Sequence, residues 1–261
     1  MGRLDNRVAL VTGAARGLGE GIAKAFAREG AVVVCADVID ASAVAESLPA
    51  AAEGRRGRAV HLDVTDTREV EDTVASIVAE YGSLDVLANN AGVAQPIASM
   101  LETTDEVIDG VFAVNVRGVI ACSRAAGRAM AEKGWGRIIN TASQVGKVAW
   151  PGWGTYSASK AAVIAVTQVM ALELAPHGVT VNCICPGTML TDMTRTGFGA
   201  SAKAAGRDVE EMLREKGESI PLGRLGSPED MGNMAVFIAS EEARYTTGAA
   251  FNLTGGEQVF F

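Results

Sequence analysis

The residues best suited to chemistry stand in one stretch, Tyr156-Ser157-Ala158-Ser159-Lys160, with Ser143 thirteen residues before it. The stretch opens a predicted helix, so Tyr156 and Lys160 lie on one face. A free tyrosine has a pKa of about 10 and is a poor base at neutral pH. A nearby ammonium favours the phenolate, and the Ser143 hydroxyl could hydrogen-bond a substrate oxygen. These residues predict acid/base chemistry at an alcohol or a carbonyl.

A second candidate site is the glycine-rich segment Thr-Gly-Ala-Ala-Arg-Gly-Leu-Gly, residues 12–19. It lies between a predicted strand and a predicted helix, whose free N–H groups and positive dipole end attract phosphate. The spacing is G-x-x-x-G-x-G rather than G-x-G-x-x-G, so the glycines alone are a weak signal. The position of the segment between a strand and a helix favours a dinucleotide site over a plain β–α turn. The candidate cofactor residues here are Gly13, Arg16, Gly17, Leu18 and Gly19.

Asp37 ends the second predicted strand, twenty residues after Gly17. A carboxylate there can accept hydrogen bonds from both adenosine ribose hydroxyls and would repel a 2′-phosphate, which favours NAD over NADP. Arg16 acts in the opposite direction, because a guanidinium beside the loop could pair with that phosphate. We expect Asp37 to dominate and NAD to be the cofactor, whose positively charged nicotinamide would further favour a phenolate at Tyr156.

The chain alternates short β-branched runs with longer amphipathic stretches, which predicts βαβ units and a parallel sheet. Strands are predicted at Arg7–Thr12, Val32–Ala36, Arg58–Leu62, Val86–Asn89, Arg137–Thr141, Thr180–Ile184 and Ala249–Leu253. Helices are predicted at Gly17–Glu29, Asp66–Tyr81, Thr104–Lys133 (one bent helix or two in series), Gly154–Ala175 and Pro228–Ser240. Asp66–Glu69 resembles a capping box, and Ser227–Asp230 combines an N-cap with an N1 proline and early acids.

Residues 188–207, rich in Gly, Ala, Thr and Ser, have no predicted helix or strand. A long irregular stretch inside a compact α/β domain is usually a functional lid. The chain shows no internal repeat and no linker-like shift in composition, and 261 residues can bury a sizeable core. We therefore predict a single domain over residues 1–261, a doubly wound α/β Rossmann fold with helices on both faces of the sheet and a substrate lid at about 188–207.

Composition excludes several classes of function. The net charge of −8 and the lack of a basic cluster argue against nucleic-acid binding. No apolar stretch approaches 18 residues, and the start does not resemble a signal peptide, so we expect a cytoplasmic protein with no membrane partner. With two histidines and no C-x-x-C, no metal site is predicted. Cys183 and Cys185 share a strand face and are better interpreted as buried thiols than as a metal or redox pair.

Six motifs occur in the order typical of one family: the loop at 12–19, Asn89-Asn90-Ala91-Gly92, Asn115, Ser143, Tyr156-x-x-x-Lys160 and Pro186-Gly187. Together they resemble the short-chain dehydrogenase/reductase family over the whole chain. The resemblance implies a seven-stranded parallel sheet, with Tyr156 as the acid/base. It also implies that Lys160 lowers the pKa of Tyr156 and holds the nicotinamide ribose, that Ser143 orients the substrate, and that Asn115 carries a proton relay through water to Lys160. Because Asn is unfavourable inside a helix, we expect a local bend at Asn115.

The same resemblance implies further cofactor contacts and an assembly. Asp63-Val64 would contact the adenine, and Asn89, Ala91 and Gly92 would form the turn that supports the cofactor. Pro186-Gly187-Thr188-Met189 would flank the nicotinamide, with Met189 and Thr191 nearest its carboxamide. Members are commonly homotetramers that pack through two long helices and the C-terminal strand, and the apolar tail Val259-Phe260-Phe261 suits burial against a neighbour.

The substrate pocket is predicted to be lined by Gln95, Ser143, Gln144, Trp150, Trp153, Tyr156, Met189 and the lid. The tryptophans could carry a sugar-like face, or they could merely pack the loop. Gly146-Lys147 and the C-terminal segment 251–258 resemble the sorbitol-6-phosphate 2-dehydrogenase branch of the family, and the segment 222–230 resembles acetoin/butanediol reductases.

We therefore predict an NAD(H)-dependent oxidoreductase acting on a secondary alcohol or ketone, with a polyol or vicinal diol as substrate. A phosphate on that substrate could be held by Lys147 or Arg195. The alternative is a 3-oxoacyl-carrier-protein or other ketone reductase. A non-catalytic NAD-binding protein is opposed by the complete set of Asn115, Ser143, Tyr156 and Lys160. The sequence leaves open the particular alcohol or ketone, its stereochemistry and the physiological direction.

Overall fold

The computed structural model describes residues 2–259, except the side chains at 53 and 204. Within these residues seven parallel strands form one sheet in the order β3-β2-β1-β4-β5-β6-β7. The strands are β1 Val8–Thr12, β2 Val32–Asp37, β3 Ala59–His61, β4 Val86–Asn89, β5 Gly136–Thr141, β6 Val179–Pro186 and β7 Ala250–Leu253. The predicted doubly wound Rossmann-type α/β fold is confirmed.

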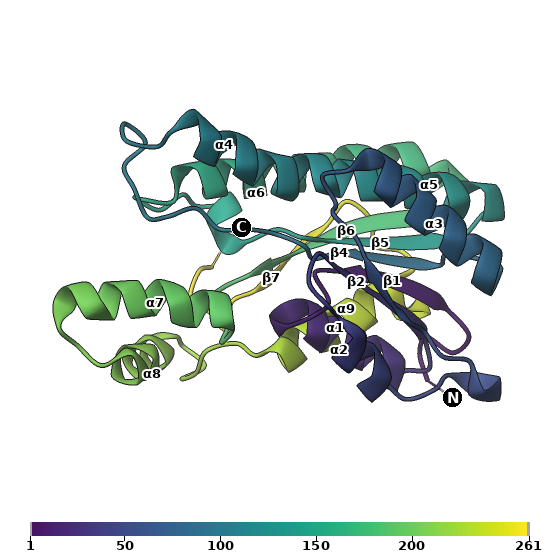
Figure 1. Cartoon of the computed structure of the whole chain (residues 1–261), viewed down its shortest axis with the longest axis horizontal. Coiled ribbons are helices and arrows are strands. Elements are labelled where there is room, and N and C mark those ends of the chain that lie inside the picture. Colours follow the sequence, from purple (N-terminus) through teal and green to yellow (C-terminus); the bar gives the residue numbers. More distant parts are fainter. Residues whose placement is uncertain (1, 260–261) are drawn as a thin grey trace.

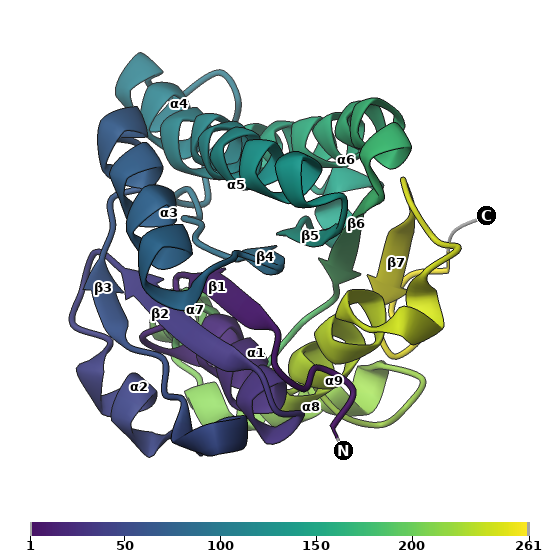
Figure 2. The ribbon, with the colours of Figure 1, turned by 90° about the vertical axis from the view of Figure 1, so that its right-hand side faces the viewer.

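Helices cover both faces of this sheet (Figures 1 and 2). They are α1 Gly17–Arg28, α2 Ser42–Ser47, α3 Thr67–Tyr81, α4 Asp105–Phe112, α5 Val119–Lys133, α6 Gly154–Leu174, α7 Asp192–Ala205, α8 Val209–Ser219 and α9 Pro228–Ala239. One face is covered by α3 to α6 and the other by α1, α2 and α9, while α7 and α8 project to one side beyond the end of β6 (Figure 1).

Burial on both faces explains the nearly continuous apolar strands. In β1, Ala9 and Val11 face the core beneath α1 and α9, whereas Val8 and Leu10 face the core beneath α3 and α5. All four are at most 1% exposed. Because successive side chains point to opposite faces, a strand covered on both sides must be apolar at every position.

Helix starts follow local capping signals. The Asp66 carboxylate accepts hydrogen bonds from the N–H groups of Arg68 and Glu69, so it caps α3 as predicted. The predicted box is only half formed, because the Glu69 carboxylate bonds His61 at 2.7 Å instead of turning back. At α9 the box between Ser227 and its third helical residue is complete, and the N1 proline is in place.

The long predicted helix at 104–133 is two helices in series. A π-helical turn, Ala113–Gly118, separates α4 from α5 and contains Asn115, which is fully buried. At Asn115, where a local bend is expected, the helix departs from regular α-helical geometry in this π-helical turn. Such π-turns occur often at functional sites.

The prediction of an irregular stretch at 188–207 is wrong for most of its length, because α7 occupies residues 192–205. Thr191 caps this helix by accepting a hydrogen bond from Thr194 N–H, and Gly206 ends it with a φ of +63°. Glycines at 197 and 199 hid the helical pattern, since glycine is a poor helix former. The helices α2 and α8 were not predicted either.

All four cysteines are buried and free, in agreement with the sequence interpretation. Among residues 2–259, the stretch Gly154–His177 alone is long and apolar enough to cross a membrane by length and composition. This stretch is essentially α6, which packs against β6 and η3 (Gln144–Gly146) as a core helix.

Candidate active site

The carboxyl ends of β1, β4, β5 and β6 meet at one edge of the sheet, and the strand order reverses between β1 and β4. In open α/β sheets a ligand crevice forms at such a reversal. The loops after these strands contain the glycine-rich segment, the Asn-Asn-Ala-Gly motif, Ser143 and Pro186-Gly187. The topology thus brings motifs that are far apart in sequence to one place.

The glycine-rich loop is held by the loop that follows β4. The Thr12 hydroxyl accepts hydrogen bonds from the N–H groups of Asn90 at 3.0 Å and Ala91 at 3.1 Å. The Asn90 amide donates to the carbonyls of Thr12 at 3.2 Å and Gly13 at 3.1 Å. A Cβ at Gly19 would lie 1.9 Å from the Gly13 oxygen, so only glycine fits there. The first turn of α1 is therefore packed directly against the loop.

Asn90 received no role in the sequence analysis, although it stands in the quoted motif. Its neighbour Asn89 is 3% exposed and points the other way, donating to Ser123 Oγ and Asn140 Oδ1, each at 2.8 Å. Adjacent residues at a strand end point to opposite sides, and this alternation was the available signal. Asn89 supports the sheet from within, whereas Asn90 shapes the loop.

Asp37 holds a fixed position beside the glycine-rich loop. Its carboxylate accepts hydrogen bonds from the N–H groups of Ala15 at 3.0 Å and Ile39 at 3.2 Å. Each oxygen keeps a lone pair for a further donor. Arg16 is directed elsewhere, because its largely exposed guanidinium lies 4.0 Å from the carboxylate of Asp192 at the start of α7. A fixed acceptor thus stands at the end of β2, and the arginine reaches toward α7.

The residues predicted around the adenine are held in place by contacts with their neighbours. Asp63 accepts hydrogen bonds from Thr65 through its N–H at 2.9 Å and its hydroxyl at 2.8 Å. The Val64 side chain packs so closely on Gly118 that a Cβ there would lie 2.7 Å from it. Leu18 is partly buried against the core under α1. Asp63 therefore orders its own turn, and Val64 ties that turn to the π-helical segment.

The segment after β6 runs over the glycine-rich loop. Pro186 is the last residue of β6, and the Gly187 N–H bonds back to the sheet through the Leu253 carbonyl at 2.9 Å. Met189 is 5% exposed and belongs to the core rather than to an open surface. Thr191 lies against the loop, since its methyl group is 3.7 Å from the position of a Cβ on Gly17.

Ser143, Tyr156 and Lys160 lie together beside the end of β5. The Ser143 hydroxyl hydrogen-bonds the Tyr156 phenol. Lys160 is 4% exposed and donates from Nζ to the Thr141 carbonyl at 2.7 Å. Its Nζ lies 5.6 Å from the centre of the Tyr156 ring. The hydroxyl, phenol and ammonium predicted from sequence thus lie together, with Ser143 and Lys160 buried and Tyr156 partly buried.

Burial dominates the protonation of these groups in the protein alone. It raises the pKa of Tyr156 to about 12, with the Ser143 hydrogen bond acting in the opposite direction. It lowers the pKa of Lys160 to about 8, partly offset by the neighbouring thiols of Cys185 and Cys183. Desolvation disfavours whichever form is charged, so it moves an acid up and a base down. The sequence analysis expected a lowered pKa at Tyr156, and the protein's own groups do not produce one.

Asn115 ties the motif after β4 to the catalytic helix. Its side-chain oxygen accepts from Val93 N–H and its amide donates to the Val93 carbonyl, both at 2.9 Å. The same amide donates to Ser159 Oγ at 3.1 Å, which in turn donates to the Tyr156 carbonyl at 2.8 Å. A Cβ at Gly92 would lie 3.3 Å from the Asn115 oxygen. The side chain of Asn115 therefore positions neighbouring backbone.

Gln95 also supports the tyrosine. Its amide oxygen accepts the Tyr156 N–H at 2.7 Å, and its amide nitrogen donates to the Gly152 carbonyl at 3.2 Å. Both ends of the amide are thereby used, and the residue is 4% exposed. The sequence analysis placed Gln95 in the substrate pocket, whereas here it caps the start of α6.

Of the other predicted pocket residues, Trp153 contacts the Tyr156 ring. Trp153 meets the Tyr156 ring edge to face, with centroids 5.7 Å apart. Trp150 lies across from α8, and Lys216 Nζ is 5.8 Å from the centre of its ring. Gln144 is 3% exposed, and within residues 2–259 its side-chain oxygen has no hydrogen-bond partner.

The two cations proposed for a substrate phosphate have protein partners. Lys147 donates to the Ala250 carbonyl at 2.8 Å and to the side chain of Asn252, both on β7. Arg195 pairs with Glu210, which joins α7 to α8. The expectation that either one serves the pocket has no support from these contacts.

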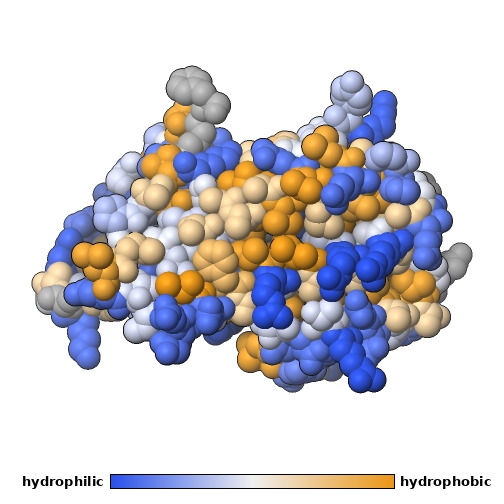
Figure 3. Space-filling model, turned by 90° about the horizontal axis from the view of Figure 1, so that it is seen from above, coloured by the Kyte–Doolittle hydropathy of each residue, from blue (hydrophilic) through white to orange (hydrophobic). Residues whose placement is uncertain are grey.

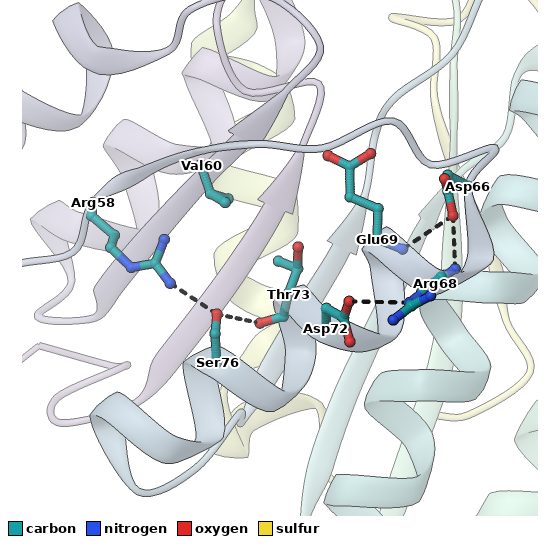
Figure 4. A pocket seen from close by; sticks show the side chains of 8 residues that line it. All are labelled: Arg58, Val60, Asp66, Arg68, Glu69, Asp72, Thr73 and Ser76. Carbon is teal, nitrogen blue, oxygen red and sulfur yellow. Dashed lines mark hydrogen bonds and ion pairs between the residues drawn. The ribbon is translucent and has the colours of Figure 1, made fainter.

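A surface depression lies away from this site, along β3 and α3 (Figure 4). It encloses about 480 Å³, and its walls are Arg58, Val60, Asp66, Arg68, Glu69, Asp72, Thr73 and Ser76. Its polar side chains bond one another, as in the pair of Arg58 and Ser76 at 2.9 Å. Within residues 2–259 no group of three or more His, Cys, Asp and Glu side chains could hold a metal ion.

This geometry places a hydroxyl, a phenol and an ammonium at the carboxyl end of the sheet, where the glycine-rich loop also lies. Residues 13–258 match the family model described as enoyl-(acyl carrier protein) reductase. Sorbitol dehydrogenase of Cereibacter sphaeroides is 41% identical over 97% of this chain and 98% of its own. Galactitol 2-dehydrogenase of Agrobacterium fabrum is 40% identical, and 3-oxoacyl-[acyl-carrier-protein] reductase of Vibrio harveyi is 38% identical, each over 97% of this chain and 98% of its own. The chain belongs to the short-chain dehydrogenase/reductase family and is an oxidoreductase acting on a CH–OH group.

Proposed function

We propose that the protein catalyses the NAD-dependent oxidation of a polyol or vicinal diol to a ketone, and the reverse reduction. The observation that carries this proposal is the cluster of Ser143, Tyr156 and Lys160 at the end of β5, beside the glycine-rich loop. When bound, the nicotinamide supplies the hydride acceptor. The residues of the chain bind the alcohol and move its proton.

The phenol of Tyr156 holds the proton at the substrate oxygen. In oxidation the ionised phenol takes the hydroxyl proton of the alcohol, and in reduction the phenol returns it to the forming alkoxide. Ser143 donates to the same oxygen. The Lys160 ammonium, held by the Thr141 carbonyl, favours the phenolate, and a positively charged ring beside it acts in the same direction.

NAD rather than NADP fits the residues around the loop. The Asp37 carboxylate is fixed by two backbone N–H groups and would repel a 2′-phosphate. Arg16, the residue that could attract such a phosphate, lies by Asp192 instead. The glycine-rich loop leaves backbone N–H groups of α1 free to meet a pyrophosphate. By position, Gly13, Gly17, Gly19, Asp63, Ala91, Gly187 and Thr191 complete the proposed cofactor site.

Two observations support a polyol. The relatives include sorbitol and galactitol dehydrogenases. The buried oxygen of Gln144, next to Ser143, has no partner within the described residues and suits a second hydroxyl of the substrate. A 3-oxoacyl reductase remains the second candidate. It is favoured by the exposed apolar side chains of Ile97 and Met100, which lie near the start of α6, and of Leu101, which follows them in the chain.

The test compares initial rates of NADH formation on hexitols, pentitols and 2,3-butanediol with rates of NADH oxidation on a 3-oxoacyl thioester. We expect the polyols to be the better substrates and 2-propanol to be clearly worse. Each lost hydroxyl partner should cost about 1–3 kcal/mol. Faster reduction of the thioester would establish the ketone-reductase alternative. Lack of turnover with either class, alongside normal NAD binding, would overturn both substrate assignments.

We further propose that the chain acts as one domain and that residues 188–207, largely α7, close over bound substrate as a lid. We also propose that the protein is a cytoplasmic homotetramer. Figure 3 shows apolar surface across the face covered by α4 to α6, and Ile120 on α5 with Val169 and Leu172 on α6 are exposed there. An exposed apolar face of this kind suits a second copy of the chain. Val259 is also exposed, whereas the rest of the predicted tail, 260–261, lies outside the described residues.

A further inference from the structure

A buried carboxylate outside the catalytic cluster joins three segments of the chain. The side chain of Glu257 is 6% exposed. Its two oxygens accept hydrogen bonds from Thr188, through the N–H at 2.7 Å and the hydroxyl at 2.8 Å. One of them also lies 2.7 Å from the Lys216 ammonium. A carboxylate is buried at such a cost that it persists only when paired and hydrogen-bonded, as here.

These contacts keep Glu257 ionised. Burial raises its pKa, but the Lys216 ammonium and the two donors of Thr188 outweigh burial and leave the pKa below its usual range. The carboxylate fits closely at the other side too, because a Cβ on Gly187 would lie 2.7 Å from it. The position is therefore built around a charged acceptor.

Glu257 and its two partners, Thr188 and Lys216, lie on elements with different tasks in the proposed site. Thr188 follows β6 and flanks the proposed nicotinamide position, and Lys216 belongs to α8 beside the lid helix. The turn that carries Glu257 also packs on the end of α8, since a Cβ on Gly256 would lie 2.9 Å from Pro221. Lys216 in turn faces Trp150, a proposed wall of the substrate pocket.

We propose that Glu257 is a positioning residue: through Thr188 and Lys216 it fixes the cofactor segment, α8 and the Trp150 loop relative to one another, and so sets the width of the substrate pocket. This inference rests on the proposed function for the identity of the pocket. It assigns the C-terminal turn a task in substrate binding.

The test is Glu257→Gln, which keeps the shape and an acceptor for Thr188 but removes the charge that holds Lys216. We expect the KM for the alcohol to rise about tenfold and kcat to change less than threefold, because the catalytic cluster is untouched. Lys216→Met should give the same split, and the double variant should be no worse than either single one, since both remove one interaction. Glu218→Gln, on the same helix in an exposed pair with Arg214, is the matched control and should stay within twofold.

Hydrogen exchange of the protein without substrate gives a second readout that needs no turnover. Exchange of the backbone at 188–190 and 209–219 should be several-fold faster in Glu257→Gln than in wild type, and unchanged in Glu218→Gln. An unchanged KM together with unchanged exchange overturns the inference, as do additive effects of the two single variants. If no alcohol is turned over, the proposed function fails, while the exchange result still decides whether Glu257 fixes these segments.

Discussion

The buried ammonium of Lys160 lowers the stability of the folded protein, and replacing Lys160 should reveal this. Burial lowers its pKa from 10.5 to about 8, and among the residues described no carboxylate lies within ion-pairing distance. At about 1.4 kcal/mol per pH unit, holding the ammonium charged in the folded protein costs roughly 3 kcal/mol. Lys160→Met keeps the side-chain length and removes this penalty. It also leaves the Thr141 carbonyl without its donor, which costs about 1–2 kcal/mol.

We therefore expect Lys160→Met to be as stable as wild type at pH 7, or up to about 2 kcal/mol more stable, although it loses its activity. The matched control is Lys133→Met. Lys133 pairs with Asp85, whose side chain is 1% exposed, so its loss removes the closest cation from a buried carboxylate that keeps the Val8 N–H at 2.8 Å and Arg7 at 3.9 Å, and should cost about 1–3 kcal/mol. Urea unfolding of both variants and wild type, without cofactor, measures these free energies.

The pH dependence of the stability tests the same reasoning independently. Between about pH 8 and 10.5 the unfolded chain binds a proton at Lys160 that the folded protein has released, so the stability of wild type rises with pH through this group. The penalty is complete below pH 8 and is relieved above it. Wild type should therefore gain roughly 3 kcal/mol relative to Lys160→Met over that range. A variant that is more than 2 kcal/mol less stable at pH 7, with a difference independent of pH, would refute this reasoning.

Three further outcomes follow from the site. Tyr156→Phe should lose about 10²–10⁴-fold in kcat but retain NAD binding by fluorescence titration, and half of the wild-type rate would remove Tyr156 as the acid/base. Asp37→Ser should raise kcat/KM with NADP and lower it with NAD, whereas a wild-type preference for NADP would show that Arg16 governs the choice. In the protein alone, burial holds the pKa of Tyr156 at about 12. The ultraviolet difference spectrum of wild type against Tyr156→Phe should therefore show no tyrosinate at about pH 10, and added NAD should make it appear.

The strands and the order of the motifs could be predicted because each depends on a local pattern. Every predicted strand appears within one or two residues of its observed ends, since a strand buried on both faces must be apolar throughout. The departure from regular α-helical geometry at Asn115 was predictable for a similar reason, because an asparagine is unfavourable inside a helix unless the backbone departs from it. The cluster of Ser143, Tyr156 and Lys160 depends on the same alternation of strand and helix.

What could not be predicted depends on contacts between distant residues. The hydrogen-bond partners of Gln95, Gly152 and Tyr156, lie about sixty residues away in the sequence. The polar side chain of Gln95 therefore suggested a pocket residue, whereas in the fold it holds the start of α6 in place. The pKa of Tyr156 likewise depends on how fully the folded chain surrounds the phenol. For α7 the local signals existed, as a threonine cap and a terminal glycine, but internal glycines concealed them.

The two segments that resembled polyol dehydrogenases prove to be one structural feature. Lys147, after the catalytic serine, donates to Asn252 and to the Ala250 carbonyl on β7, so the Gly146-Lys147 segment contacts the C-terminal segment 251–258. Residues that pair in this way would be expected to change together in evolution for the sake of the pair. The two resemblances therefore count as a single observation, which concerns how the turn after Ser143 is attached to the sheet. Any preference for a polyol must then arise from other side chains near the catalytic cluster, and the candidates are Trp153, which contacts the Tyr156 ring, and Gln144, which follows Ser143 and has a buried oxygen without a partner within the described residues.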